Sequence, residues 1–234
     1  MTVPVAITEG APLGRKTLAD LAYERLSDLL ISGRLTPGDK VSLRSTADAL
    51  GVSMMPIREA VTRLVADQAL EVTPNRAVRV PVLTAARFRD LTRVRVEVEG
   101  YAAAEAARHR CTADLAAIAD REAAFAAEGR ILRPDLSRAV ELNKDFHFAV
   151  YTAAKSPALI DIIRALWLKV GPVINLDLRA NPERVQSGGA AGYHAAALAA
   201  IREGDPVAAR VAIAADIAGA AEFILSRGGL PDGD

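Results

Sequence analysis

Apolar positions near the start of the chain recur at helical spacing. After Thr17, a residue type that caps helices, leucine and alanine return every three or four residues as far as Leu30, which predicts an amphipathic helix. The segment SGRLTPGDK ends this helix. The same reasoning predicts a short helix from Leu43 to Leu50, a turn at Gly51 and a third helix from Ser53 to about Asp67.

The pattern then changes from helical spacing to alternation. In LEVTPNRAVRVPV, residues 70–82, apolar and polar positions alternate on both sides of the turn sequence TPNRA, which predicts a small β-hairpin. A helix, a helix–turn–helix and a hairpin, in this order, are typical of a winged helix–turn–helix domain, here residues 17–81. Residues 1–16 show neither pattern and contain two prolines and two glycines, so we expect a flexible arm.

From Thr84 to about residue 228 only helical patterns are found. Capping residues, several of them next to proline, mark helix starts at Thr84, Thr112, Pro134-Asp135, Ser156-Pro157, Asn181-Pro182 and Asp205-Pro206. Glycines fall where helices should stop, at Gly129, Gly204 and Gly228. These signals predict six or seven helices. The expected fold class is therefore mainly α, with a winged helix–turn–helix followed by an all-helical bundle.

Composition narrows the possible functions. The 234 residues include 29 basic and 29 acidic side chains, so DNA binding would depend on the local placement of arginines and not on overall charge. No run approaches the ~18 apolar residues of a membrane span, so no membrane partner is expected. The N-terminus has no signal-peptide pattern, and the chain has a single cysteine, which favours a cytoplasmic protein.

The helix that begins at Ser53 has one apolar face for the core and a tip with polar side chains and two methionines. The N-terminal part of the second helix of a helix–turn–helix enters the major groove, where Arg58 would reach a guanine edge or a phosphate. The candidate DNA-contacting residues are Arg44, Ser53, Met54, Met55, Arg58, Arg63, Arg76 and Arg79. The alternative is a solvated helical hairpin with ordinary surface arginines, in which the methionines only fill gaps in packing.

The segments ISGRLTPGDKVS, ALGVS, PIREAVTRL and PNRAVRV resemble the N-terminal domain of the GntR family of bacterial transcription regulators. The resemblance covers about Leu18 to Val80 and implies a homodimer that binds a short palindromic operator through a recognition helix and a wing. It also implies that Arg44 and Arg58 contact DNA. Two positions depart from the family, because many members have arginine where Met54 stands and glycine where Ala77 stands.

Three later segments, LTRVRVEVEGYAAAEAARH, ELNKDFHFAVYTAAKSP and GYHAAALAAIREGDPVAARVAIAADI, resemble the all-helical (FCD-type) domain of the FadR-type branch of that family. The resemblance implies an effector-binding and dimerisation domain over residues 84–228 that binds a small organic or sugar acid, often beside a divalent metal ion. Arg95 matches an arginine that commonly faces the effector in this branch. Its alternative is an ion pair with Glu99, four residues further along the same helix, and the two are compatible.

Four more residues are candidates for holding the metal ion. Asn143 and His147 are four residues apart on one helix face, while His194 and Asp216 lie on later helices. Together they could converge inside a bundle and bind a zinc, nickel or manganese type ion. The effector candidates are Arg95, Asn143, His147 and His194. The family pattern often has aspartate in place of Asn143 and usually histidine in place of Asp216, and a histidine in a helix can also be an ordinary packing or surface residue.

These observations lead to one principal hypothesis and two alternatives. The chain is expected to be a ligand-responsive transcription regulator, most often a repressor in such families, and not an enzyme. A metal-dependent enzyme that uses His147, His194 and Asp216 is the first alternative, but the sequence has no activated nucleophile, phosphate-binding glycine loop or HExxH motif. An architectural DNA binder is the second, although it would leave more than half of the chain without a role.

Overall fold

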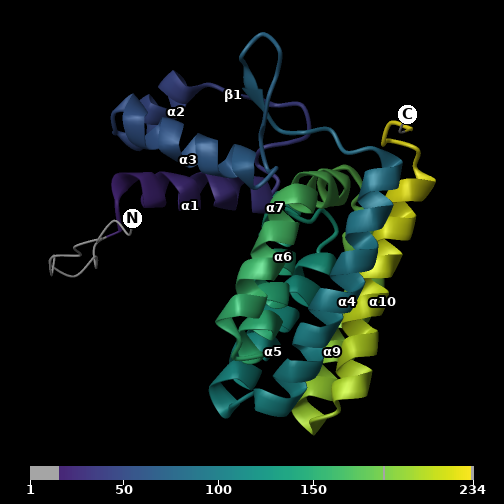
Figure 1. Ribbon diagram of the computed structural model, residues 1–234. Coiled ribbons are helices and arrows are strands. Elements are labelled where there is room, and N and C mark those ends of the chain that lie inside the picture. Colours follow the sequence, from purple (N-terminus) through teal and green to yellow (C-terminus); the bar gives the residue numbers. More distant parts are fainter. Residues whose placement is uncertain (1–15, 187, 233–234) are drawn as a thin grey trace, which may run out of the picture.

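The structure is a computed structural model in which residues 16–186 and 188–232 are described (Figure 1). The predicted flexible arm, residues 1–16, lies outside the described residues apart from Lys16. Figure 1 shows a small N-terminal part with the short strands, and a long helical bundle beside it. The predicted mainly helical fold is confirmed. No helix in the described part of the chain has the length and hydrophobicity that crossing a bilayer requires.

Three helices form most of the N-terminal part, and the sequence explains where they begin and end. They are α1 (Leu18–Ile31), α2 (Leu43–Leu50) and α3 (Met54–Ala66). Thr17 and Asp20 form a capping box at the start of α1. Gly51 ends α2 with a φ of 65°, a left-handed conformation that glycine adopts without steric cost. The three helices predicted from the spacing of apolar residues are therefore confirmed.

The predicted hairpin is also present, as part of a three-stranded antiparallel sheet. β2 (Glu71–Val72) and β3 (Val78–Arg79) pair with each other, and β3 also pairs with β1 (Lys40–Val41). The strand order is β1-β3-β2. β1 was not predicted, because a strand of two residues is too short to show alternation. Its pairing with β3 joins the connection between α1 and α2 to the hairpin by backbone hydrogen bonds.

Seven helices of the described residues form the bundle. They are α4 (Ala85–His109), α5 (Thr112–Gly129), α6 (Leu136–Ala153), α7 (Pro157–Ala180), α8 (Glu183–Gln186), α9 (Gly189–Glu203) and α10 (Pro206–Ser226). Thr84, Asp135, Ser156 and Asp205 cap the helices that follow them, as predicted. The start predicted at Asn181-Pro182 leads only to the four-residue α8, and the longer helix α9 begins after Gly188 instead. Glycine has no side chain that could signal a cap, so this start was missed.

Helices α4 and α10 lie side by side along the length of the bundle (Figure 1). The other long helices pack beside and across them, so the bundle has a continuous interior. The main hydrophobic core extends from this interior into the N-terminal part, because it includes buried residues of α1 and α3 as well as of the bundle. The two parts are therefore packed against each other, and the contact is apolar in its centre.

Helix α7 makes the polar contacts between the two parts. The Asn175 side chain donates a hydrogen bond to the carbonyl of Ile31, and Arg179 donates to the carbonyls of Gly33 at 2.5 Å and Ser32 at 3.1 Å. Carbonyls at the C-terminal end of a helix lack intrahelical partners, so α7 caps the end of α1. Gly33 permits the close approach, because a Cβ atom there would lie 2.3 Å from the Asn175 Cβ atom.

Candidate functional site

The N-terminal tip of α3 carries four of the predicted DNA-contacting residues, and all four are exposed. Ser53 occupies the cap position, but its side chain makes no capping hydrogen bond. Met54 and Met55 are 41% and 70% exposed, and Arg58 is exposed one turn further along the helix. Large apolar side chains usually avoid such exposure. The tip therefore presents a hydroxyl group, two apolar side chains and a positive charge to whatever lies against it.

Arg44 on α2 and Arg76 in the hairpin turn are exposed as well. Within the described residues, neither of them nor Arg58 forms an ion pair. The backbone of Arg76 has the left-handed conformation in this turn, with a φ of 63°. Ala77 has no positive φ, so the hairpin forms without the glycine that the family often has at this position.

Arg63 and Arg79 have acidic partners instead. Arg63 Nη1 lies 2.7 Å from Asp20 Oδ1, and its guanidinium carbon lies 4.2 Å from the centre of the Tyr23 ring on α1. The hydrogen bond from Arg63 is the largest of the effects that lower the pKa of Asp20 to about 2. Arg79 Nε lies 2.5 Å from Glu71 Oε1 across the hairpin. Arg63 thus packs α3 against α1, and we leave it out of the DNA contacts proposed below.

His147 on α6, His194 on α9 and Asp216 on α10 meet inside the bundle. One ligand atom from each lies within 4.8 Å of the others, and the side chains are only 3%, 0% and 9% exposed. Asp216 Oδ2 lies 3.1 Å from His147 Nε2 and 3.8 Å from His194 Nε2. Asn143, one helical turn before His147, lines a small cavity of about 20 Å³ together with His147 and Asp216. The sequence separates these residues widely, and the fold brings them together.

Two of the ligand-atom spacings in this cluster fit a bound metal ion. Ligand nitrogen and oxygen atoms lie about 2.0–2.2 Å from a zinc ion, so two of them on one ion lie roughly 3–4 Å apart. The two distances from Asp216 Oδ2 are in this range. In addition, neither ring nitrogen of His194 has a hydrogen-bond partner within the described residues, although the side chain is fully buried. Such unpaired buried groups are costly, and coordination would satisfy one of them.

Burial and the neighbouring charges favour the ligating forms of these side chains. Burial lowers the pKa of His194, which keeps the imidazole neutral and able to bind a metal ion. Burial alone would raise the pKa of Asp216, but hydrogen bonding to His147 and the proximity of His194 outweigh it and hold this pKa well below its usual value. The cluster therefore offers a neutral imidazole and a carboxylate at the same place.

A chain of hydrogen bonds orients His147. Its Nδ1 atom lies 3.0 Å from the Tyr151 hydroxyl, and that hydroxyl donates a hydrogen bond to Glu99. The hydroxyl has only one proton, so it must accept the hydrogen bond from His147 Nδ1–H. With an ion bound in place of the Nε2–Asp216 hydrogen bond, the proton on Nδ1 would keep its contact with Tyr151, and the Nε2 lone pair would be free to bind the ion. Tyr151 was not identified from the sequence, where it is one apolar-face residue among many.

Arg95 forms the ion pair with Glu99 that the helical spacing suggested. Arg95 Nε lies 2.5 Å from Glu99 Oε1, and Nη2 lies 3.1 Å from Oε2. Glu99 is fully buried and also accepts a hydrogen bond of 3.1 Å from Trp167 Nε1. Arg95 lines the small cavity beside the cluster, but two of its donors are used by Glu99. A direct contact between Arg95 and an effector stays a prediction.

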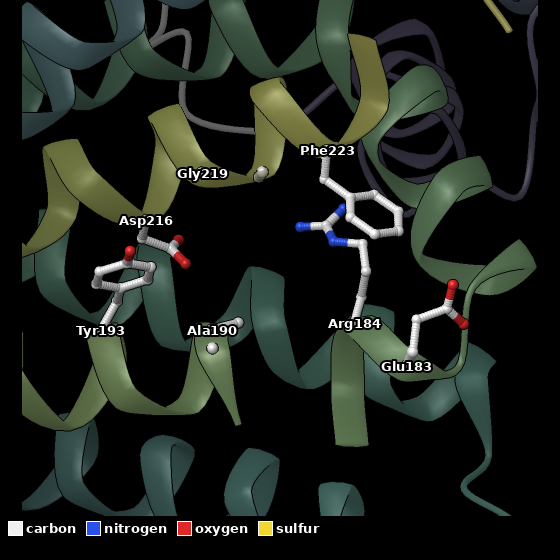
Figure 2. A pocket seen from close by; sticks show the side chains of 9 residues that line it. Glu183, Arg184, Ala190, Tyr193, Asp216, Gly219 and Phe223 are labelled. Atoms are coloured by element: carbon white, nitrogen blue, oxygen red, sulfur yellow. The ribbon is translucent and has the colours of Figure 1, made fainter. Parts of the chain in front are cut away.

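An outer pocket of about 330 Å³ lies next to the small cavity (Figure 2). The two share Asp216, Arg184 and two alanines. Figure 2 shows Asp216 and Tyr193 on one side of the pocket, Arg184 and Phe223 on the other, and Gly219 on α10 between them. Arg184 was not identified from the sequence, because an arginine in a short polar segment between two long helices gives no pattern that distinguishes it from a surface residue.

Comparisons with known proteins support the two-part architecture. The family described as "Bacterial regulatory proteins, gntR family" matches residues 18–80, and the FCD domain family matches residues 90–219. The HTH-type transcriptional regulator McbR of Escherichia coli (strain K12) is 32% identical over 147 residues, which cover 63% of this chain and 66% of McbR. The Nta operon transcriptional regulator of Aminobacter aminovorans is 25% identical over 138 residues, which cover 59% of this chain and 64% of that regulator. Both alignments span slightly less than two thirds of the relative.

Solved structures extend the similarity over nearly the whole chain. E. coli McbR/YncC matches with a TM-score of 0.83 at 26% identity, covering 92% of this chain and 100% of that chain. A GntR structure from Rhodococcus sp. RHA1 has the same fold, with a TM-score of 0.69 at 22% identity over 89% of this chain and 97% of that one. The named relatives are transcription regulators, so the alternative of a metal-dependent enzyme has no support. The chain belongs to the GntR family of bacterial regulatory proteins and carries the FCD domain.

Proposed function

We propose that the protein is a cytoplasmic bacterial repressor that binds operator DNA as a homodimer and releases it when a small carboxylate binds inside the helical bundle. One observation carries the proposal. The same chain combines an exposed, cationic tip on α3 with a buried cluster of His147, His194 and Asp216 next to a pocket. The tip suits a nucleic-acid groove, and the cluster suits a metal ion and an acid.

For the DNA-binding part, we assign the α3 tip to the major groove. A helix that enters the groove with its N-terminal end contacts base edges there, and Arg58 has the reach and the donors to grip a guanine. Met54 and Met55 would lie against thymine methyl groups or sugars. Arg44 and Arg76 are assigned to phosphates, which position a protein on DNA without reading its sequence.

For the bundle, we assign one divalent ion to His147, His194 and Asp216, with Asn143 as a weak fourth ligand or as a hydrogen-bond partner of a ligand. Two imidazoles and one carboxylate suit zinc, nickel or manganese type ions. A divalent charge on this cluster exceeds the single negative charge of Asp216. The bound ion would therefore remove the repulsion that Asp216 exerts on an approaching carboxylate.

The outward face of α4 and α10 supports the homodimer. Val94 and Tyr101 are exposed seven residues apart on α4, and Val207 and Val211 are exposed four residues apart on α10. Each pair lies on one side of its helix, and the two helices lie against each other. Pairs of exposed apolar side chains on one side of a helix suit a subunit contact. Two copies would present two α3 helices to the two halves of a palindrome.

Protein purified without chelators and without a histidine tag allows the proposal to be tested. We expect about one divalent ion per chain by elemental analysis, and specific binding to the DNA upstream of its own gene compared with scrambled DNA. His194→Ala should lose the ion but still bind the operator. His109→Ala is the matched control, because His109 is an exposed histidine on α4. Equal affinity for operator and scrambled DNA, or an ion retained by a variant lacking both His147 and His194, would contradict the proposal.

A further inference from the structure

Two arginines line the small cavity beside the metal-ligand cluster, and they use different donors. Arg95 uses Nε and Nη2, the edge of the guanidinium that can hold a carboxylate through two parallel hydrogen bonds, on Glu99. Arg184 uses Nη1, which lies 2.6 Å from Asp177 Oδ2. Within the described residues, Nε and Nη2 of Arg184 donate no hydrogen bond. The edge that is occupied in Arg95 is therefore available in Arg184.

Arg184 is also held in a fixed position. Its side chain is 11% exposed, Asp177 holds it from the last turn of α7, and its guanidinium carbon lies 5.5 Å from the centre of the Phe223 ring. In Figure 2 the guanidinium lies against Phe223 and points toward the middle of the outer pocket. A charged group that is already stacked and hydrogen-bonded loses little freedom when it binds a ligand, so Arg184 is preorganised for an anion.

The walls of the outer pocket limit what else the ligand can carry. Tyr193 and Phe223 contribute aromatic rings, and four glycine and alanine residues contribute backbone and methyl groups. The polar groups are the side chains of Glu183, Arg184 and Asp216 and the hydroxyl of Tyr193. Glu183 is paired with Arg227, and Asp216 belongs to the metal-ligand cluster. A sugar acid has a hydroxyl on almost every carbon, and each buried hydroxyl needs a partner. This pocket supplies too few partners for such a ligand, whereas a flat apolar ring matches its walls.

We propose that Arg184 holds the carboxylate of the effector in the outer pocket, and that the effector is an aromatic monocarboxylate and not a sugar acid. Its ring lies between Tyr193 and Phe223. The volume of about 330 Å³ is at the low end for small-molecule sites, which are typically ~300–1,000 Å³, so the pocket favours a single ring. The inference rests on the proposed function, because it names the effector class of the same regulator.

Calorimetry of the full-length, metal-containing protein with benzoate, benzamide and D-gluconate tests the inference. Benzamide has the shape of benzoate without its charge, and gluconate has the charge without the ring. We expect benzoate to bind at least tenfold more tightly than either. Arg184→Gln should weaken benzoate binding by roughly tenfold or more, because it removes a charge-assisted pair of hydrogen bonds. Arg184→Lys should weaken it as well, since an ammonium group cannot present the two-donor edge.

Arg202→Gln is the matched control. Arg202 is an exposed arginine on α9 that lines neither the outer pocket nor the small cavity, so this variant should keep the affinity for benzoate. Gly219→Leu is a second, independent variant. A Cβ atom at Gly219 would meet Tyr193 Cε2 at 3.6 Å, an ordinary contact, so a longer side chain would fill the pocket and abolish benzoate binding. Metal content and melting temperature report whether each variant is folded.

The outcomes separate this inference from the proposed function. Unchanged benzoate affinity in folded Arg184→Gln and Gly219→Leu variants would overturn the assignment of the carboxylate site. A parent protein that prefers gluconate, or that does not bind benzoate at millimolar concentration, would overturn the effector class while operator binding stands. Failure of the parent protein to distinguish operator from scrambled DNA would instead contradict the proposed function itself.

Discussion

At the scale of single residues, two arginines on α3 should behave differently when they are removed. Arg58 is exposed and Arg63 is held by Asp20 and Tyr23. We expect Arg58→Ala to weaken operator binding by about 1–3 kcal/mol if Arg58 reads a base, with little change in melting temperature. Arg63→Ala should mainly lower the melting temperature, because it removes contacts between α1 and α3. Fluorescence anisotropy with labelled DNA and thermal melting measure the two effects.

The outcome with scrambled DNA decides what Arg58 touches. If Arg58→Ala loses the same affinity for operator and scrambled DNA, the residue contacts a phosphate, since phosphate contacts carry no sequence information. If the affinity for both DNAs is unchanged, the assignment of the α3 tip to the major groove is wrong at its most important position.

The sequence revealed the metal-ligand candidates but not the residues that support them. His147 and His194 were noticeable because the chain has only three histidines and because their residue type binds metals. Tyr151 and Trp167 were not noticeable, since they reach Glu99 from 52 and 68 residues away, and no local pattern encodes such a contact. Partners of buried polar groups become predictable only when the packing of the helices is known.

At the scale of elements, the contact between the end of α1 and α7 gives a testable prediction. Gly33 and Gly51 both have a left-handed backbone, with φ of 62° and 65°, so alanine should cost about 1–2 kcal/mol of stability at either position. At Gly33 the added Cβ would also lie 2.3 Å from Asn175 Cβ, whereas nothing lies within 4 Å at Gly51. We expect Gly33→Ala to lower the free energy of unfolding by about 1–3 kcal/mol more than Gly51→Ala.

Urea denaturation of the two variants measures this difference, and Gly51→Ala serves as the control for backbone strain. Equal losses of stability would show that α7 moves away from α1 without cost. Such a result would mean that the contact between the two parts is weaker than the hydrogen bonds of Asn175 and Arg179 indicate.

The elements that were predicted are those whose sequence signal is local. Capping residues and proline gave the starts of α4, α6, α7 and α10, because cap hydrogen bonds join residues two or three positions apart. The strand β1 and the start of α9 were missed for the opposite reason. β1 forms by pairing with β3, and its Val41 lies opposite Val78, 37 residues later in the chain. α9 begins at a glycine.

At the scale of the whole molecule, α7 connects the candidate effector site to the DNA-binding part. Trp167, Ile174 and Leu178 line the small cavity beside the metal-ligand cluster, while Asn175 and Arg179 hold the end of α1. The sequence predicted two parts in the right order, but it could not show that α7 joins them. A ligand that moves α7 would change the support of α1, and with it the position of α3.

Replacing Arg179 tests whether this contact transmits the effector signal. Arg179 donates two hydrogen bonds to the end of α1 and lines neither the small cavity nor the outer pocket. Arg179→Ala should therefore keep its metal ion and its affinity for benzoate in the absence of DNA. The ratio of operator affinities without and with benzoate, typically 5–150-fold when two sites are coupled, should fall toward one. Arg202→Ala, an exposed arginine on α9, is the control.

Thermodynamic reciprocity makes this prediction strict. If benzoate lowers the affinity for the operator by some factor, the operator must lower the affinity for benzoate by the same factor. Arg179→Ala should reduce both factors equally, because both describe one coupling free energy between the sites. Anisotropy measures the first factor, and calorimetry with and without saturating operator measures the second. If a folded Arg179→Ala protein shows the same two affinity changes as the parent protein, the signal reaches α3 by another route. The connection from β3 to α4 is then the next element to test.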